Sequence, residues 1–83
     1  MKFYTQEDAE FLIQFFTNIL VGTSIEPPNE ILITGLEWEL YEGNNYRVIC
    51  RVNHYQGVTI IDDVAHVAEL QGIVSPEEVL ANK

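Results

Sequence analysis

Basic residues are scarce in this chain of 83 residues, which has only 4 Lys and Arg against 13 Asp and Glu. The formal net charge is therefore −9, and the phosphate backbone of nucleic acid repels so acidic a chain. This excludes direct nucleic-acid binding as the simple interpretation. No apolar run approaches the roughly 18 residues that a membrane-spanning helix needs, so we expect no membrane insertion.

Cysteine is almost absent. Cys50 alone cannot close an intrachain disulfide, and no zinc-binding spacing of Cys and His residues occurs. The chain also lacks an Asn-x-Ser/Thr sequon, and the acidic Glu7, Asp8 and Glu10 stand where a signal peptide would carry positive charge. These absences together favour a reducing compartment, and we expect a cytoplasmic protein.

Glycine-rich phosphate-binding loops are missing as well, because the five glycines are scattered along the chain. Apolar residues, in contrast, make up 47% of the chain and charged residues 20%, which is typical of a folded globular protein. We expect a single acidic α+β domain over residues 1–83. A domain of this size buries only about 60–65% of the surface that its unfolded chain exposes, so dense packing or oligomerisation must help.

The N-terminal segment predicts an unusually apolar helix. Thr5 is the expected N-cap of a helix over 6–20 that ends near Gly22. An ordinary surface helix has an apolar stripe somewhat over 100° wide, and this one is roughly twice as wide. Either a second layer of the fold covers this face, or Phe11 and Phe15 lie in an oligomer interface.

A β-hairpin is predicted over 30–42 and 46–55, where apolar and polar residues alternate. The preceding segment 23–29 contains Pro27 and Pro28 and is expected to be a loop. A short third strand is expected over 58–61.

Matching of side chains selects the register of the hairpin. A two-residue loop would place Leu40 opposite Arg47 and bring charge onto the core face. A three-residue loop, Gly43-Asn44-Asn45, keeps both faces matched and is therefore predicted. It pairs Leu40 with Val48, Trp38 with Cys50, Leu36 with Val52, Glu37 with Arg51 and Tyr41 with Arg47.

Two short helices are predicted at the C-terminal end. Asp62 is the expected N-cap of a helix over 63–71 that ends at Gly72. Ser75 starts a capping box for a helix over 76–81. The expected fold is therefore α+β: a three-stranded antiparallel meander with an N-terminal helix and two short C-terminal helices, in the order α-β-β-β-α-α.

Metal-ligating residue types occur, but they are few. His54, His66, Asp62 and Asp63 are the candidates, and Asp62 and His66 share a helix face. Zinc needs three or four nitrogen or sulfur ligands, and the only thiol, Cys50, is predicted in the core. A capping aspartate and a helical histidine explain the same residues, so we expect no metal and no cofactor.

Two arrangements could carry catalysis. Cys50 and His54 lie four residues apart on a predicted strand, about 13 Å, which is too far for a hydrogen bond. Glu37 and Glu39 lie about 6–7 Å apart on one strand face, a spacing compatible with glycosidase chemistry. Arg51 opposite Glu37 should keep that carboxylate ionised, so we expect that the protein is not an enzyme.

The acidic surface is the remaining functional signal. Carboxylates can occupy a surface made for phosphates, because they accept hydrogen bonds from the same Arg and Lys donors. We expect a small non-catalytic acidic module, a nucleic-acid mimic, that binds a basic surface of a partner protein, possible partners being nucleic-acid enzymes. The residues predicted to bind the partner are Glu7, Glu10, Glu37, Glu39 and Glu42.

In size, charge and expected element order, the chain is similar to small acidic phage inhibitors of nucleic-acid enzymes, such as some anti-CRISPR proteins. The resemblance covers architecture only, and it transfers no residues. Two alternatives stay open. The acidity could serve solubility alone, or the chain could be a homo-oligomeric structural or assembly subunit, such as a homodimer, built on the apolar face of the first helix.

Overall fold

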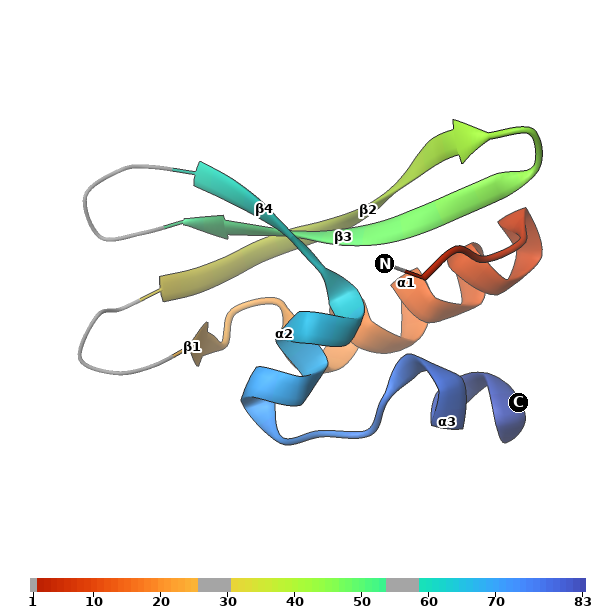
Figure 1. Cartoon of the computed structure of the whole chain (residues 1–83). Coiled ribbons are helices and arrows are strands. Elements are labelled where there is room, and N and C mark those ends of the chain that lie inside the picture. Colours follow the sequence, from red (N-terminus) through yellow and green to blue (C-terminus); the bar gives the residue numbers. More distant parts are fainter. Residues whose placement is uncertain (1, 26–30, 54–58) are drawn as a thin grey trace.

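The computed structural model describes residues 2–25, 31–53 and 59–83 (Figure 1). Four antiparallel strands form one sheet in the order β1-β2-β3-β4, and the helices cover one of its faces (Figure 1). This confirms the expected α+β fold, in which β2, β3 and β4 form the meander. The elements in chain order are α1 (Gln6–Leu20), β1 (Ser24–Ile25), β2 (Ile31–Glu42), β3 (Asn45–Asn53), β4 (Thr59–Asp63), α2 (Val64–Gln71) and α3 (Pro76–Ala81).

Most of the predicted helix boundaries are confirmed by their caps. The Thr5 side chain accepts a hydrogen bond from the Asp8 amide at 3.2 Å. Ser75 accepts one from the Glu78 amide at 3.3 Å. Gly72 ends α2 with φ +69°, the left-handed conformation that glycine adopts without strain.

Two predicted element boundaries were wrong. The N-cap of α2 is Asp63, whose side chain accepts from the Ala65 amide at 2.8 Å, because β4 continues to this residue instead of ending at 61. In the segment predicted as a loop, Ser24–Ile25 pairs with β2 as the short strand β1. The two prolines that predicted this loop, together with the predicted strand residues 30, 54, 55 and 58, lie outside the described residues.

The turn of the hairpin is shorter than predicted, and the register differs. β2 ends at Glu42 and β3 begins at Asn45, so Gly43 and Asn44 alone form the turn. Gly43 has φ +58°, in the region that favours glycine. The observed pairs are Leu36 with Cys50, Glu37 with Ile49, Trp38 with Val48, Glu39 with Arg47 and Leu40 with Tyr46, so each predicted pair was wrong by two positions.

A β-bulge explains how a two-residue turn keeps both faces matched. On a regular ladder this turn would place Leu40 opposite Arg47. The register shifts between Leu40 and Glu42, which makes Tyr41 an extra residue in β2. Leu40 therefore lies opposite Tyr46. Because the displacement from the predicted register is two residues over 35–40, the side chains there keep their predicted faces, whereas a second shift between Ile33 and Gly35 turns Ile33 into the core.

The core lies between α1, α2 and the helix side of the sheet (Figure 1). Cys50 belongs to it with no exposed surface, as predicted. The other members with 2% exposure or less are Ala9, Leu12, Phe16, Leu20, Ile33, Val48, Val52, Val64, Val67 and Ala68. Within the described ranges, no helix is both long and apolar enough to span a bilayer.

Candidate functional site

The face of the sheet opposite the helices carries two ion pairs. Arg51 Nη2 lies 2.8 Å from Glu37 Oε1, a diagonal contact, because Arg51 is opposite Gly35 and not opposite Glu37 as predicted. Arg47 Nη2 lies 2.9 Å from Glu39 Oε1, whereas the predicted register had placed Arg47 beside Tyr41. Ile49 lies between the two arginines along β3 and is only 1% exposed. The paired side chains thus also cover this apolar residue.

The other two cations join the chain ends to the helices. Lys2 pairs with Glu77 at the start of α3, and the hydrogen bond from Lys2 holds the pKa of Glu77 below its usual value. Lys83 pairs with Asp8 in the first turn of α1, and the hydrogen bond to Asp8 raises the pKa of Lys83. All four Lys and Arg residues of the chain are therefore engaged in ion pairs.

Several carboxylates have no such partner. Within the part of the chain that the structure describes, the side chains of Glu10, Glu42, Glu69 and Glu78 form no ion pair. All four residues are exposed. Because every Lys and Arg already faces another acid, the charge of these four side chains is uncompensated.

A groove between α1 and β2 brings two of the predicted partner-binding residues together. It has a volume of about 410 Å³. Glu10 and Gln14 contribute to it from α1, one helical turn apart, and Glu37 contributes from β2. The apolar lining includes Trp38, which is half-buried and whose ring lies 5.4 Å from that of Tyr46. This groove joins acids from both predicted acidic elements to a half-buried aromatic side chain.

The remaining predicted partner-binding residues lie elsewhere. Glu39 is on the outer face of the sheet with Arg47. Glu42 is the last residue of β2, at the turn of the hairpin. Glu7 is in the first turn of α1, where its charge contributes to the raised pKa of Lys83. The five acids thus do not form a single row: Glu10 and Glu37 border one groove, and the other three lie apart from it.

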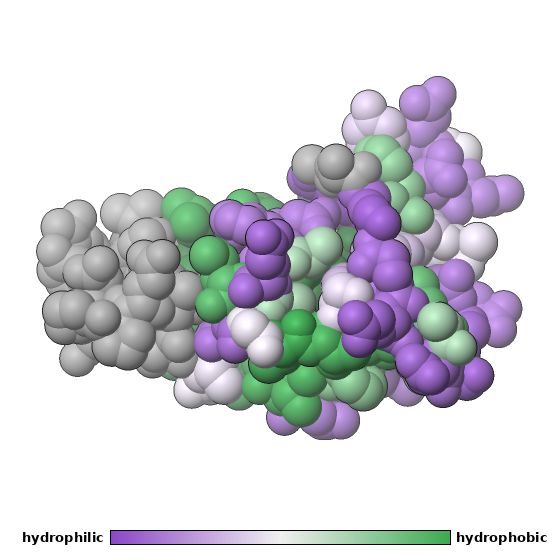
Figure 2. Space-filling model, turned by 60° about the horizontal axis from the view of Figure 1, so that its bottom comes forward, coloured by the Kyte–Doolittle hydropathy of each residue, from purple (hydrophilic) through white to green (hydrophobic). Residues whose placement is uncertain are grey.

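The exposed part of the α1 apolar face borders a second groove. Phe11 and Phe15 are 37% and 38% exposed, and together with Val74 and Val79 they line a hollow of about 200 Å³ between α1 and α3. The Lys83 ammonium lies 5.6 Å from the centre of the Phe11 ring. Figure 2 shows apolar side chains gathered on this helical side of the molecule, with hydrophilic side chains around them.

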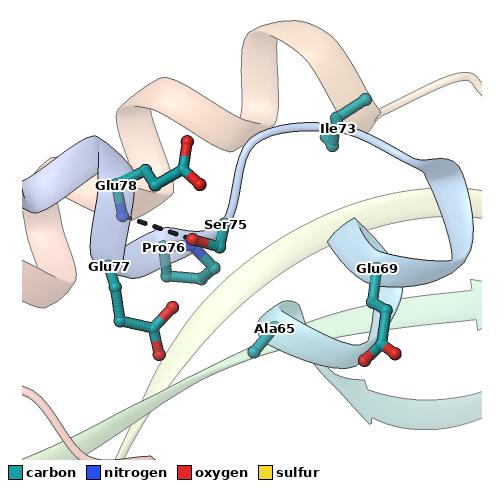
Figure 3. Close-up of a pocket in the computed structure, with 7 residues that line it drawn as sticks. All are labelled: Ala65, Glu69, Ile73, Ser75, Pro76, Glu77 and Glu78. Atoms are coloured by element: carbon teal, nitrogen blue, oxygen red, sulfur yellow. Dashed lines mark hydrogen bonds between the residues drawn. The ribbon is translucent and has the colours of Figure 1, made fainter.

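A third hollow lies between α2 and α3 and has a volume of about 390 Å³ (Figure 3). Glu69 and Glu77 extend from the two helices on either side of it. The hydroxyl of Ser75 is used by the cap of α3. Of the acids that line this hollow, Glu77 is already paired with Lys2.

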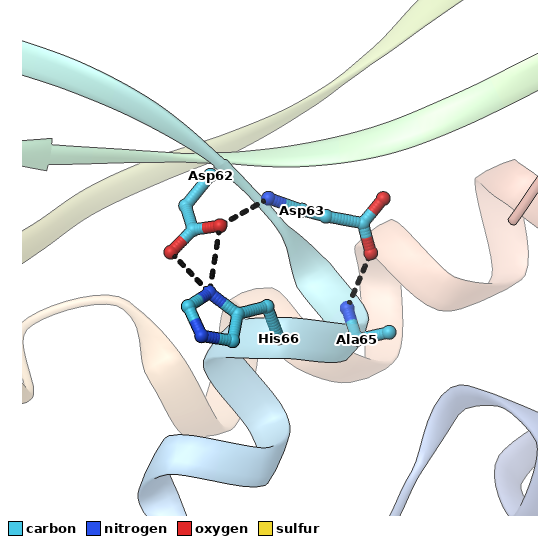
Figure 4. Close-up of polar contacts among 4 residues, drawn as sticks. All are labelled: Asp62, Asp63, Ala65 and His66. Atoms are coloured by element: carbon cyan, nitrogen blue, oxygen red, sulfur yellow. Dashed lines mark hydrogen bonds and ion pairs between the residues drawn. The ribbon is translucent and has the colours of Figure 1, made fainter. Parts of the chain in front are cut away.

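The Asp62–His66 pair has a structural explanation (Figure 4). Asp62 accepts a hydrogen bond from the Asp63 amide at 2.8 Å and lies 2.8 Å from His66 Nδ1. Asp63 caps α2 through the Ala65 amide. No group of three metal-ligating side chains occurs among the described residues, while His54 lies outside them.

Cys50 is poorly suited to be a nucleophile. Burial raises the pKa of its thiol to about 12, and the nearby Asp62 and Asp63 carboxylates act in the same direction. The thiolate is the reactive form, so a thiol with this pKa stays inert at neutral pH. His54, which the sequence placed too far from Cys50 for a hydrogen bond, is not among the described residues.

The other pair considered for catalysis is engaged by arginines. Glu37 accepts a hydrogen bond from Arg51, and Glu39 is paired with Arg47.

Sequence reasoning missed the contribution of Trp38 and Gln14 to the groove. The spacing of Glu10 and Gln14 could have placed both on one helix face. Only the packing of α1 against β2 shows that this face borders Trp38.

No family model, no curated protein and no solved structure matches this chain, so its function has to be argued from this geometry.

Proposed function

We propose that this protein is a non-catalytic acidic binding module that occupies a basic, nucleic-acid-binding surface of a partner protein and acts as its inhibitor or regulator in the cytoplasm. One observation carries the proposal. All four Lys and Arg residues already face acids, whereas Glu10, Glu42 and other exposed carboxylates have no ion pair among the described residues. The molecule therefore offers negative charge and retains no surplus cation to repel a basic partner.

The chemistry of recognition follows from the donors of such a partner. Arg and Lys side chains that hold phosphates donate equally well to carboxylates, and Arg can bind a carboxylate through two parallel hydrogen bonds. The pairs at Glu37 and Glu39 do not prevent this, because both glutamate side chains remain more than 40% exposed. Exposed ion pairs contribute only about 0–1 kcal/mol each, so a partner's arginine can share these carboxylates.

The test is capture of partners from the native host, followed by binding measurements with the purified partner. We expect a basic nucleic-acid-binding protein, competition by its own nucleic acid, and an affinity that falls as salt rises. Glu10→Lys/Glu42→Lys should weaken binding by roughly tenfold or more, and this variant breaks no observed ion pair. Glu37→Lys/Glu39→Lys should weaken it as well.

The matched control is Glu69→Lys/Glu78→Lys. It changes the net charge by the same amount, but on α2 and α3, at residues that do not line the groove between α1 and β2. The proposal would be refuted if the partner bound the native protein, Glu10→Lys/Glu42→Lys and Glu37→Lys/Glu39→Lys with equal affinity. Equal losses in all variants, including the control, would reduce the effect to net charge alone and would also contradict it.

A second candidate function rests on the exposed rings of Phe11 and Phe15 beside their apolar hollow. In this alternative the protein is a homo-oligomeric structural or assembly subunit, and the two rings pack against a second copy. Phe11→Gln/Phe15→Gln should then convert a dimer to a monomer in light scattering. A mass of the native protein near 9.5 kDa that does not change with concentration would exclude this alternative.

A further inference from the structure

The outer edge of β2 is open over most of its length. β1 pairs with β2 only at Ile31 and Leu32, and the backbone of Ile33 bonds to Gly22 and Thr23 at 2.8 and 3.0 Å. Beyond Ile33, no described strand pairs with this edge. Over 35–40 the pairing with β3 has no register shift, so alternate backbone N–H and C=O groups point regularly toward the open side.

The groove between α1 and β2 runs along this open edge. Three consecutive residues of β2 line it, namely Leu36, Glu37 and Trp38. Successive side chains of a strand point to opposite faces, so one face alone cannot supply all three. The groove therefore includes the edge itself, where the backbone of β2 is accessible. Glu10 stands across from it on α1.

Acidic side chains flank both faces of the position that an added strand would take. On the helix side, this position lies beside Glu10 and the half-buried Trp38. On the outer side, it lies beside Glu37 and Glu39, whose side chains are 42% and 47% exposed. Directly opposite side chains on neighbouring strands interact, and opposite charges stabilise the pair.

We propose that an extended basic segment of the partner adds to the sheet as a fifth strand along 35–40 of β2. One of its Lys or Arg side chains enters the groove between Glu10 and Trp38, where a cation can also contact the ring face. The neighbouring positions of the segment point to the outer face of the sheet, and Lys or Arg residues there lie beside Glu37 and Glu39. Main-chain hydrogen bonds supply affinity, and the alternate side chains supply selectivity for basic sequences. This inference rests on the proposed function and specifies its binding mode.

Charge argues against a second copy of this chain as the occupant. Pairing of two β2 edges would bring Glu37 and Glu39 of one copy close to the same residues of the other. Like charges on adjacent strands are destabilising, and acidic side chains on an edge are a common protection against self-pairing. With a basic strand as the partner, the same glutamate side chains attract the added strand instead of repelling it.

The experiment uses a synthetic peptide of about ten residues in which Lys and Arg alternate with Thr and Val, residues that favour strands. A second peptide has the same sequence with N-methyl groups on its central residues, so it keeps its charge and loses its main-chain donors. Binding to the full chain is measured by titration, with amide hydrogen exchange as the structural readout. We expect the methylated peptide to bind roughly tenfold more weakly or worse. The unmethylated peptide should protect alternate amides over 35–40.

Variants test the side-chain part of the inference. Glu10→Gln should weaken the unmethylated peptide several-fold, whereas Glu69→Gln, on α2, should change its affinity little. Equal affinity for the two peptides, or protection outside β2, overturns strand addition and leaves the proposed function standing. The same conclusion follows if neither peptide binds while a basic partner does. If neither the peptides nor any basic partner binds, the proposed function itself fails.

Discussion

At the scale of single residues, Tyr4 is the least satisfied member of the core. The residue is 8% exposed, and its hydroxyl has no hydrogen-bond partner among the described residues. Burial raises its pKa to about 12, with further contributions from the Asp63 and Glu77 charges. The Asp63 Oδ2 atom is also buried and without a partner in this part of the structure. A buried polar atom without a partner costs about 1–3 kcal/mol, so the hydroxyl of Tyr4 destabilises the fold.

Removal of this hydroxyl should therefore not harm the protein. We expect Tyr4→Phe to leave the free energy of unfolding at neutral pH unchanged or to raise it by about 1 kcal/mol. The exposed Tyr41, 60% accessible, provides the control, and Tyr41→Phe should have little effect at neutral pH. A loss of stability in Tyr4→Phe, measured by urea unfolding, would indicate that the hydroxyl makes a stabilising bond.

The same variant should flatten the alkaline limb of the stability profile. Between the ordinary pKa of tyrosine, 10.0, and the folded value of about 12, the unfolded state loses the Tyr4 proton and the native state keeps it. Stability then falls as pH rises, because the unfolded state binds fewer protons. Cys50 acts in the same direction from 9.0 to about 12, so a slope should remain in Tyr4→Phe. An unchanged slope would contradict the raised pKa of Tyr4.

At the scale of elements, the hairpin shows what local sequence patterns determine. Period-two alternation identified both strands and the faces of the side chains over 35–40, since these depend only on neighbours along the chain. It does not extend to Ile33, which a second register shift turns into the core. The register was wrong because the choice between two and three turn residues assumed a regular ladder. A bulged residue such as Tyr41 has no compositional signal, and only pairing across the two strands reveals it.

The candidate site was predictable to a similar degree. The acids of the first helix and of the hairpin were identified, and Glu10 and Glu37 do border one groove. The open edge of β2 could not be predicted from the sequence, because the edge is open only where the two-residue strand β1 ends. The position of Trp38 could not be predicted either, since a half-buried core residue and a groove residue have the same pattern.

Deletion of Tyr41 tests the role of the bulge. Without it, Glu42 follows Leu40 directly, so the two-residue turn keeps Leu40 opposite Tyr46 on a regular ladder. We therefore expect the register and the strand faces to be kept, and a loss of stability within about 1 kcal/mol of that of Tyr41→Ala. Tyr41→Ala is the control, because it keeps the residue count and removes only the ring, which lies 4.6 Å from that of Phe3. A loss in the deletion that exceeds that of Tyr41→Ala by more than about 2 kcal/mol would mean that the bulge itself, and not only the ring, stabilises the hairpin.

At the scale of the whole molecule, like charges dominate the electrostatics. The net charge is −9, while the four ion pairs to Lys and Arg are all partly or largely exposed. Such pairs contribute about 0–1 kcal/mol each and are screened by salt. Repulsion among the remaining carboxylates acts over the whole surface of a small molecule, and it destabilises the compact state.

Added salt should therefore stabilise this protein. At about 0.1 M ionic strength the Debye length is about 10 Å, shorter than the smallest principal extent of the molecule, 19 Å. We expect the urea midpoint to rise with NaCl from about 0.02 to 0.3 M, because screening of the repulsion outweighs the weakening of four exposed pairs. Glu10→Gln/Glu42→Gln, with a net charge of −9 + 2 = −7, should be more stable at low salt and gain less from NaCl. A urea midpoint that falls with NaCl would mean that the ion pairs, and not the unpaired carboxylates, dominate the electrostatic contribution to stability. That result would also contradict the idea that uncompensated carboxylates are available to a basic partner.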